Sequence, residues 1–362
     1  MNRRRLFLCA GSMVAASLIW LPLAFGIRAA ESLPTRVSDQ ELLMMVSEFS
    51  EPDGTFRSDN LLSNEFRLQT VIPELLMTAK TGGVYMGVGP EQNFTYIAAL
   101  KPAMAFIVDI RRGNLDLQLF YKAVFELSTD RADFVSRLFA RERPAGLTMH
   151  STVQEIFAAY GPMPLSDALY TETLKAIRNQ LVTKRGFALS KDDLERVEYV
   201  YHAFALFGPR IQYSSTGLGG FGGGYGGFGP QITYADLMTA TDADGHARSY
   251  LASEESFTFL KTLETNNLLV PVVGDFAGPK AIRSVGRYLK EKRGTVSAFY
   301  LSNVEMYLRR DGLWASFCAN VATLPLDESS TFIRSLRGGQ FGRGGGLASE
   351  LGSMESETSP CR

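Results

Sequence analysis

Residues 84–108 restrict the choice of fold most, because they read as a strand, a turn, a helix and a second strand. Val84 to Met86 are a short apolar run, Gly87 to Glu91 read as a turn, and Asn93 to Leu100 have helical periodicity. Ala103 to Val108 form the next apolar run. Such a unit places two parallel strands side by side with the helix packed across them. We therefore predict a parallel sheet.

The same alternation returns near the carboxyl end of the chain. Apolar runs and periodicity predict a helix over 115–127, a strand over 268–273, a helix over 279–292 and a strand over 295–301. Residues 313–324 are a candidate for a further strand. This pattern predicts an α/β fold, a Rossmann-like three-layer parallel sheet with helices on both faces.

Between the two halves, residues 114–266 read mostly as helices, over 131–140, 151–159, 165–183 and 190–206. We interpret this stretch as an inserted helical subdomain. The halves of the Rossmann-like domain are then 31–113 and 267–336. Residues 217–229 contain mainly glycine with interspersed aromatics, which favours a flexible surface loop, the alternative being a mobile lid or a partner contact.

The segments that flank the predicted domain differ in character. Ser38 and Glu41 have the spacing of a capping box, which indicates a helix, and a second helix is expected over 64–79 although Pro73 lies inside it. At the other end, residues 337–362 begin with a glycine-rich stretch. We expect this tail to be disordered.

The first 30 residues read as a targeting segment. Arg4-Arg5-Leu6-Phe7-Leu8 resembles the core of the twin-arginine export motif, and an apolar region rich in Ala, Gly and Ser follows. Ala29-Ala30 is a candidate cleavage site. The alternative is an uncleaved anchor over residues 6–27. Either reading places the remainder of the chain outside the cytoplasm, in the periplasm or cell envelope, with membrane contact only through residues 6–27 if they are retained.

Composition excludes several classes of function. The formal charge is −1, and loss of residues 1–29 removes four arginines, so the remainder carries about −5 and gives no reason to expect a nucleic-acid partner. Cys9 would leave with the signal, and Cys361 would lie in the tail, so we do not expect disulfides to hold the fold. The three histidines have no ligand spacing, and no metal is expected.

The turn after the first strand is the main candidate for a site. Gly87 and Gly89 let the backbone approach a ligand closely, and Glu91 and Asn93 lie at the start of the following helix. Asp109 ends the next strand, about 20 residues on, where an acid would bind ribose hydroxyls. A carboxylate at Glu91 would repel a pyrophosphate. The turn therefore favours a small polar ligand and disfavours NAD and FAD.

These positions resemble class I S-adenosylmethionine-dependent methyltransferases. The resemblance implies that Gly87, Gly89 and Glu91 contact the methionine part of S-adenosylmethionine, that Asp109 contacts its ribose, and that Asp275, in Val272-Val273-Gly274-Asp275-Phe276, lies near its adenine. The loop after the fourth strand, residues 300–305, would then supply catalytic candidates, Asn303 and Glu305. It lacks the Pro-Pro-Tyr pattern of amino-group methyltransferases, so the target atom stays open.

Residues 40–335 also resemble a bacterial family of largely uncharacterised proteins. The matching stretches are residues 87–98, 108–112, 274–278 and 300–305. This resemblance implies a Rossmann-like architecture and no particular activity.

Each candidate residue also has a structural interpretation. Gly87 and Gly89 would permit tight strand–helix packing, Asp109 would pair with Arg111 or Arg112, and Asp275 would cap the helix that begins near residue 279. The polar runs Ser58-Asp59-Asn60 and Ser63-Asn64-Glu65 would either cap a helix or form the rim of a pocket.

Three functions remain open. The first is an exported methyltransferase-like protein that binds a small polar ligand such as S-adenosylmethionine, although that compound is made in the cytoplasm. The second is a non-catalytic scaffold or interaction protein of the cell envelope on a degenerate Rossmann-like fold. The third is a hydrolase with a carboxylate-centred site formed by Glu305, Asp275 and Glu91. A nucleophilic triad is not indicated, because no Gly-x-Ser-x-Gly occurs.

Overall fold

The computed structural model describes residues 32–56, 58–213, 232–337 and 347–361. The expected export signal at 1–30 and the glycine-rich segment at 217–229 lie outside these residues. Residues Glu31–Arg362 form one compact unit that is separate from Met1–Ala30. In the described part of the chain, no helix is both long enough and apolar enough to cross a membrane.

A six-stranded sheet forms the centre of the compact unit. Its strands are β1 (Val84–Gly87), β2 (Met104–Asp109), β3 (Leu269–Val273), β4 (Val296–Ser302), β5 (Thr331–Arg337) and β6 (Leu347–Ser353). Their order is β3-β2-β1-β4-β5-β6, with β1 to β5 parallel and β6 antiparallel to β5. The order reverses between β1 and β4, as in doubly wound dinucleotide-binding folds. The predicted Rossmann-like α/β fold is confirmed.

Fourteen α-helices are distributed around this sheet in the described residues. They are α1 (Asp39–Phe49), α2 (Ile72–Thr78), α3 (Gln92–Leu100), α4 (Arg112–Leu127), α5 (Arg131–Phe139), α6 (Val153–Tyr160), α7 (Asp167–Arg178), α8 (Lys191–Phe207), α9 (Tyr234–Thr239), α10 (Glu254–Thr265), α11 (Ala281–Glu291), α12 (Val304–Arg310), α13 (Trp314–Val321) and α14 (Met354–Thr358). A π-helical turn, Asn179–Lys184, continues α7.

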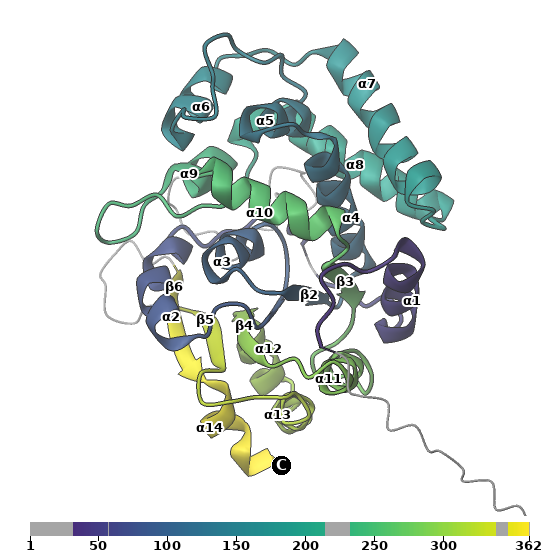
Figure 1. The fold of residues 1–362 in the computed structure, drawn as a ribbon, viewed down its shortest axis with the longest axis vertical. Helices are drawn as coiled ribbons and strands as arrows, with labels where there is room; N and C mark the ends of the chain where they lie inside the picture. Colours follow the sequence, from purple (N-terminus) through teal and green to yellow (C-terminus); the bar gives the residue numbers. More distant parts are fainter. Residues whose placement is uncertain (1–31, 57, 214–231, 338–346, 362) are drawn as a thin grey trace, which may run out of the picture. The chain divides into compact units, whose positions relative to one another are not determined.

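The helices form layers on both faces of the sheet. α1, α11 and α13 pack together on one face, and α3, α4 and α10 pack on the other. α5 to α9 lie beyond the second layer, at the top of Figure 1, with the sheet below them. The predicted insertion at 114–266 is therefore a crossover made of α4 and α10, with α5 to α9 as an excursion between them. All of it belongs to one compact unit with the sheet.

Local sequence accounts for several helix boundaries. The Ser38 side chain accepts a hydrogen bond from the Glu41 amide at the start of α1, and Ser190 and Asp193 form a reciprocal capping box at the start of α8. Pro73 does not interrupt a helix over 64–79. A 3₁₀ turn, Leu68–Val71, comes first, and the proline occupies the first turn of α2, where its missing amide hydrogen costs no bond.

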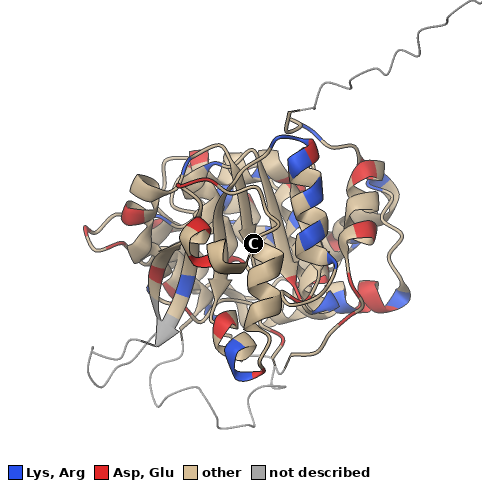
Figure 2. Cartoon of the chain, turned by 90° about the horizontal axis from the view of Figure 1, so that it is seen from below, with Lys and Arg blue, Asp and Glu red and all other residues tan. Residues whose placement is uncertain are grey.

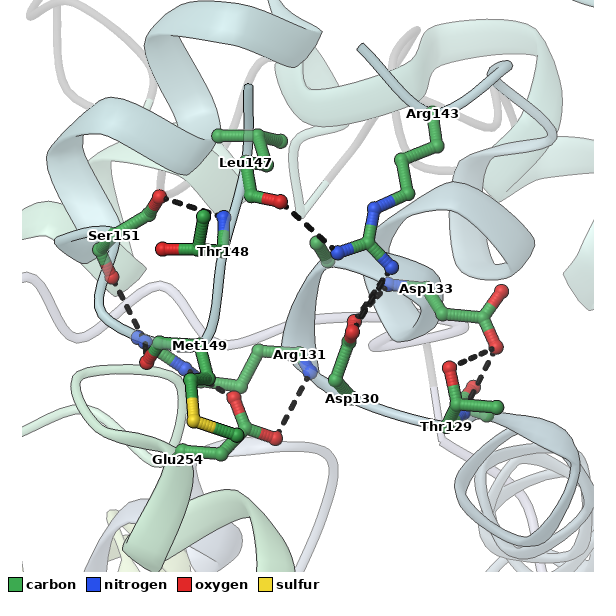
Figure 3. Close-up of polar contacts among 12 residues, drawn as sticks. Thr129, Asp130, Arg131, Asp133, Arg143, Leu147, Thr148, Met149, Ser151 and Glu254 are labelled. Atoms are coloured by element: carbon green, nitrogen blue, oxygen red, sulfur yellow. Dashed lines mark hydrogen bonds and ion pairs between the residues drawn. The ribbon is translucent and has the colours of Figure 1, made fainter. Parts of the chain in front are cut away.

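Arg131 ties the excursion to the crossover helix α10 (Figure 3). Its Nε lies 3.0 Å from Glu254 Oε2, and its Nη2 donates to the carbonyl oxygens of Met149 and Ser151 at 3.0 and 2.8 Å. Arg143 pairs with Asp130, the residue that caps α5. Because Arg131 is almost fully buried, these bonds hold the loop before α6 against the rest of the unit.

The structure corrects the prediction of a strand over 313–324. Residues Trp314–Val321 form α13, and Phe317 and Val321, four residues apart, face the core. The fifth strand is instead β5, from Thr331 to Arg337. The apolar run is short, and periodicity alone does not distinguish a buried helix from a buried strand at such a length.

The prediction of a disordered tail and a fold without disulfides is also wrong. β6 pairs with β5 along its length, α14 follows it, and Cys361 forms a disulfide with Cys318 of α13, with Cα atoms 5.8 Å apart. The glycine-rich start of residues 337–362 suggested disorder for the whole tail, but a regular strand follows it. Antiparallel pairing and the disulfide supply the stabilisation that this segment's composition does not indicate.

Candidate functional site

The segment from Ser50 to Glu65, called the strap below, crosses the carboxyl ends of the strands, and its described residues, all except residue 57, form no helix or strand. Its contacts reach four strands or their following loops in turn. They are Glu51 N to Val273 O at 2.8 Å, Gly54 N to Ile110 O at 2.8 Å, Ser63 N to Glu91 Oε1 at 3.0 Å, and Tyr300 Oη to Glu65 Oε1 at 2.6 Å. Open α/β sheets bind ligands at this edge. Here the chain itself covers it.

Two strap carboxylates occupy helix amino termini. Glu51 accepts hydrogen bonds from the amides of Lys280 and Ala281 at 2.7 and 2.9 Å, at the start of α11. Asp53 accepts from the Arg112 amide at 2.6 Å, at the start of α4. A helix amino terminus favours an anion. Both positions where a ligand's negative group would be stabilised are thus filled by the protein's own acids.

Asp109 pairs with Arg111, one of the two partners considered from the sequence. Arg111 Nε lies 3.1 Å from Asp109 Oδ1 and Nη2 lies 3.1 Å from Oδ2. Arg111 Nη1 also donates to the carbonyl oxygens of Ser58 and Asp59 in the strap, at 3.0 and 2.5 Å. The two charged side chains are buried. The acid expected at a ribose therefore anchors the strap through Arg111.

The turn after β1 is held by Asn93. Its Nδ2 donates to the carbonyl oxygens of Val88, Gly89 and Pro90, and its Oδ1 accepts from Tyr85 Oη at 2.8 Å. A Cβ on Gly87 would lie 1.9 Å from that Oδ1, whereas Gly89 has a positive φ of 80°. The turn requires its glycines for packing and backbone conformation, and Asn93 contacts the protein itself.

Glu91 and Glu65 are buried acids on opposite sides of this turn. The Ser63 amide donates to both oxygens of Glu91, at 3.0 and 3.2 Å. Burial, reinforced by the nearby Glu65, raises the pKa of Glu91 to about 8 against the lowering effect of backbone hydrogen bonds. Burial also raises the pKa of Glu65, opposed by the hydroxyls of Ser335, Tyr300 and Ser302. Glu91 is therefore mostly protonated at neutral pH.

The point between β1 and β4 where the strand order reverses contains more polar groups than these acids. Tyr300 Oη accepts from Gln92 Nε2 at 3.1 Å and donates to Glu65, and Ser302 Oγ donates to Glu65 at 2.7 Å. Gln92 Oε1 is buried without a hydrogen-bond partner, whereas Glu65 and Tyr96 lie within reach of the Ser335 and Ser349 hydroxyls. We call this set, Glu65, Glu91, Gln92, Tyr96, Tyr300 and Ser302, the switch-point cluster. Unpaired buried polar atoms of this kind call for an explanation.

Backbone strain is found at the same edge. Six non-glycine residues among those described have positive φ, and four of them end helices. The remaining two are Asn60 in the strap, with φ 47°, and Ser302 at the end of β4, with φ 50°. The pairing of β4 with β5 is irregular next to Ser302. Residues held in such conformations concentrate at functional sites.

The other predicted site residues are separated. Asp275 accepts from the Ala277 amide at 2.8 Å, within its own turn, and it is Glu51 that caps α11. Asn303 precedes α12 without capping it through its side chain. Glu305 binds Arg334 Nε at 2.8 Å. β3 and β4 are three strand spacings apart, about 14 Å. Asp275 and Glu305 are thus not brought into one carboxylate-centred site.

An open cleft of about 300 Å³ lies beside the strap. It is lined by Thr55 and Phe56 of the strap and by Tyr307 and Arg310 of α12. The two rings are 5.7 Å apart and nearly perpendicular, and the Arg310 guanidinium lies 5.2 Å from the Tyr307 ring. Arg111 lies 5.9 Å from the Phe56 ring. The cleft offers aromatic surface next to positive charge.

A second group of polar residues lies in the turn before α10. Asp242, Asp244 and His246 bring one ligand atom each within 4.8 Å of one another. The Asp242 carboxylate already accepts from Arg248 Nε at 2.5 Å and from the amides of Asp244 and His246. These bonds explain the turn without a metal.

Sequence reasoning missed the roles of Glu51, Arg111 and Tyr300. Arg111, two residues after the acid that ends β2, was recognised only as one alternative partner for Asp109. Tyr300 read as part of an apolar strand. Nothing in the local sequence distinguishes Glu51 as a helix cap, because the amides that it binds lie more than 220 residues away.

Comparison with known proteins identifies the family to which the chain belongs. No curated protein matches the chain. A family model described as a domain of unknown function (DUF7790) matches residues 61–191 and 231–351, which are more than half of the chain and include all six strands apart from the end of β6. The match also includes the turn after β1, Asp109, Arg111 and the switch-point cluster. The chain therefore belongs to the family defined by this domain of unknown function, DUF7790.

Proposed function

We propose that the protein binds a small polar ligand at the carboxyl edge of its sheet, in the cleft between the strap and α12. The proposal is supported by the convergence at one edge of two buried acids with raised pKa values, the unpaired Gln92 Oε1 and two strained residues, at the edge that also carries an open cleft. An adenosine-type ligand such as S-adenosylmethionine is the first class to test, because the methyltransferase resemblance implies it. The proposal concerns binding and leaves catalysis aside.

The chemistry of the cleft suits a planar ring that carries a negative group. The ring would pack against Phe56 and Tyr307, and the negative group would face the guanidinium group of Arg310, which also pairs with Asp311. The positions that the resemblance assigns to the cofactor, Glu91 and Asp109, are engaged by the strap and by Arg111. A ligand in the cleft does not need the strap to leave, whereas a ligand along the turn after β1 does.

Calorimetric titration of the purified full chain with S-adenosylmethionine and with S-adenosylhomocysteine tests the proposal. We expect saturable heat and a rise in melting temperature, since a ligand at 100 times its Kd stabilises the folded state by about 2.7 kcal/mol. Phe56→Ala should abolish the heat. The half-exposed side chain contributes little to the core, so the variant should keep its far-ultraviolet circular dichroism.

A matched control uses the second cleft of the molecule. This cleft, about 400 Å³, lies between α10 and the end of α3 and contains Phe259. Phe259→Ala should leave the titration unchanged. Equal losses in the two variants would contradict the proposed location. No heat and no stabilisation with either compound would reject the adenosine-type class.

A second candidate function is a non-catalytic scaffold of the cell envelope. The strap favours it, because strap groups occupy the places where an open α/β sheet binds ligands. Ser63→Pro separates the two candidates, since it removes the amide that binds Glu91 and loosens the strap. A ligand held in the cleft should bind the variant less tightly than the parent, because the loosened strap carries Thr55 and Phe56 of the cleft wall. A scaffold without a ligand would bind in neither form.

We also propose that the chain is exported by the twin-arginine route. The motif at Arg4-Arg5 supports this, and so does the disulfide between Cys318 and Cys361, because disulfides persist in oxidising compartments. Replacing Arg4 and Arg5 by Lys should retain the protein in the cytoplasm. Amino-terminal sequencing of the exported form would distinguish cleavage after Ala30 from an anchor over residues 6–27. Cytoplasmic protein in which Cys318 and Cys361 are free thiols would contradict export.

A further inference from the structure

Helix α11 carries a stripe of basic residues. Lys280, which immediately precedes the helix, is followed at helical spacing by Arg283, Arg287 and Lys290. Three of the four are exposed and Arg283 is half-buried. Figure 2 shows Lys and Arg in blue along a helix to the right of the carboxyl terminus. We call these four residues the basic stripe. On a helix, positions three and four apart lie on the same face.

The basic stripe is fixed in its orientation. Ile282, Val285 and Leu289 on the opposite side of α11 are completely buried, and the helix packs against α1, α13 and β2. The helix therefore cannot rotate to hide its cations. The sheet holds them as one outward-facing row, about 15 Å long at the rise of an α-helix.

The charges of the stripe are not neutralised by acids in the described part of the chain. Lys280 Nζ donates to the Ser50 carbonyl oxygen at 2.7 Å, Arg283 Nε to Asn320 Oδ1 at 2.7 Å, and Arg287 Nη2 to Ser284 Oγ at 2.9 Å. These acceptors are uncharged. No ion pair joins any of the four cations to a described carboxylate.

The chain enters the compact unit at one end of this helix. A Cβ on Gly294, just after α11, would lie 3.0 Å from Leu33 Cδ2 and 3.3 Å from Leu289 Cδ2, so Leu33 packs at this end. Residues 6–27, the apolar segment of the sequence, are joined to the unit through the few residues before Leu33.

We propose that the basic stripe of α11 is a docking surface for anionic phospholipid headgroups, which orients the compact unit on a membrane. Four to eight Lys or Arg residues on one face of a helix are sufficient for such binding. Without residues 1–29 the chain carries a formal charge of about −5, so an anionic surface repels most of its faces and attracts this one. The inference rests on charge and position, independently of the proposed ligand site.

Vesicle binding tests this surface. Residues 31–362, which contain the whole described core, are mixed with vesicles of phosphatidylcholine alone or with about one third phosphatidylglycerol, and the bound fraction is measured by sedimentation. Binding should require the anionic lipid and should weaken strongly at high salt, because the Debye length falls to about 3 Å at 1 M. Each basic residue contributes about fivefold in affinity near an anionic surface.

A triple variant and a matched control make the assay specific. Lys280→Gln with Arg287→Gln and Lys290→Gln should weaken binding about a hundredfold. The control replaces three exposed lysines outside α11 by Gln: Lys175 on α7, Lys184 on the π-helical turn that continues it, and Lys191 at the start of α8. It has the same net charge as the triple variant and should bind as the parent does.

Three results would overturn the proposal. They are equal binding to neutral and anionic vesicles, equal losses in the triple variant and the control, and binding to duplex DNA as tight as binding to vesicles. The first would indicate apolar adsorption and the second an effect of net charge. The third would identify a nucleic-acid surface instead.

Discussion

Glu91→Gln is the most direct perturbation of the candidate site. The change removes an ionisable group and keeps the size of the side chain, and the glutamine oxygen can still accept from the Ser63 amide. Because Glu91 is fully buried and its pKa is raised to about 8 from 4.5, the folded parent protein keeps this carboxyl mostly protonated at neutral pH, which lowers its stability relative to the unfolded chain. The variant has no such loss.

The sign and size of the effect follow from the two pKa values. Below pH 4.5 the carboxyl is protonated in both the folded and the unfolded chain, so the contribution of Glu91 to the free energy of unfolding does not change with pH. Between 4.5 and about 8 the unfolded chain releases the proton while the folded chain keeps it, and the free energy of unfolding falls by about 1.4 kcal/mol for each pH unit. From about pH 5 to pH 7 the loss due to Glu91 is about 2.5 kcal/mol.

Urea unfolding followed by circular dichroism at pH 5, 6 and 7, without reducing agent, measures this loss. Relative to the parent, Glu91→Gln should gain about 2 to 3 kcal/mol of stability between the first and last pH. Asp116 and Glu264, whose pKa values burial raises to about 6 and about 8, titrate in both proteins and cancel in the difference. As a control, Glu255→Gln removes an exposed acid whose pKa is lowered by Lys101, so its difference from the parent should not change.

A constant difference between Glu91→Gln and its parent across this range would refute the reasoning. A variant that becomes relatively less stable as pH rises would do so more strongly. Either result would mean that Glu91 is ionised in the folded protein, and the strap would then be held by a charge-assisted bond.

Three further substitutions test the packing around the site. Gly87→Ala forces a Cβ against a neighbouring side chain and should lower the free energy of unfolding by about 2 kcal/mol or more. Gly113→Ala, in α4 with open space around its Cβ, should lower it by nothing and could raise it by up to about 1 kcal/mol in urea unfolding. Cys318→Ser opens a loop of 43 residues and should lower the free energy of unfolding by about 4 kcal/mol. The variant should melt at the same lower temperature as the reduced parent, and an unchanged melting temperature would contradict the disulfide. Glu51→Gln removes the anion at the start of α11 and should cost about 1 to 2 kcal/mol in urea unfolding, and no loss would mean that the carboxylate does not cap the helix.

Local patterns accounted for much of the fold. The strands at 84–87 and 269–273 are buried along their whole length, so they read as continuous apolar runs, and the helices between them alternate with them as a parallel sheet requires. The caps at Ser38 and Ser190 act within four residues of the chain. Features of this kind are set by neighbouring residues, and sequence therefore reports them.

The tail shows where such patterns fail. β6 is a strand because β5 offers it an antiparallel edge, and α14 is held by a disulfide to Cys318, 43 residues earlier. Neither partner is visible in the composition of residues 337–362. The same limit explains why the apolar run over 313–324 was assigned to the wrong kind of element.

The sequence by itself determined that strand ends bring Gly87, Glu91 and Asp109 to one edge of a parallel sheet. Only the tertiary structure decided what those residues contact there. Glu91 meets Ser63, 28 residues away, and Glu65 meets Tyr300, 235 residues away, because the strap crosses strands that are adjacent in the sheet and distant in the chain. Burial at that crossing, which depends on every element packed around it, is also what raises the pKa of Glu91 and keeps its carboxyl protonated.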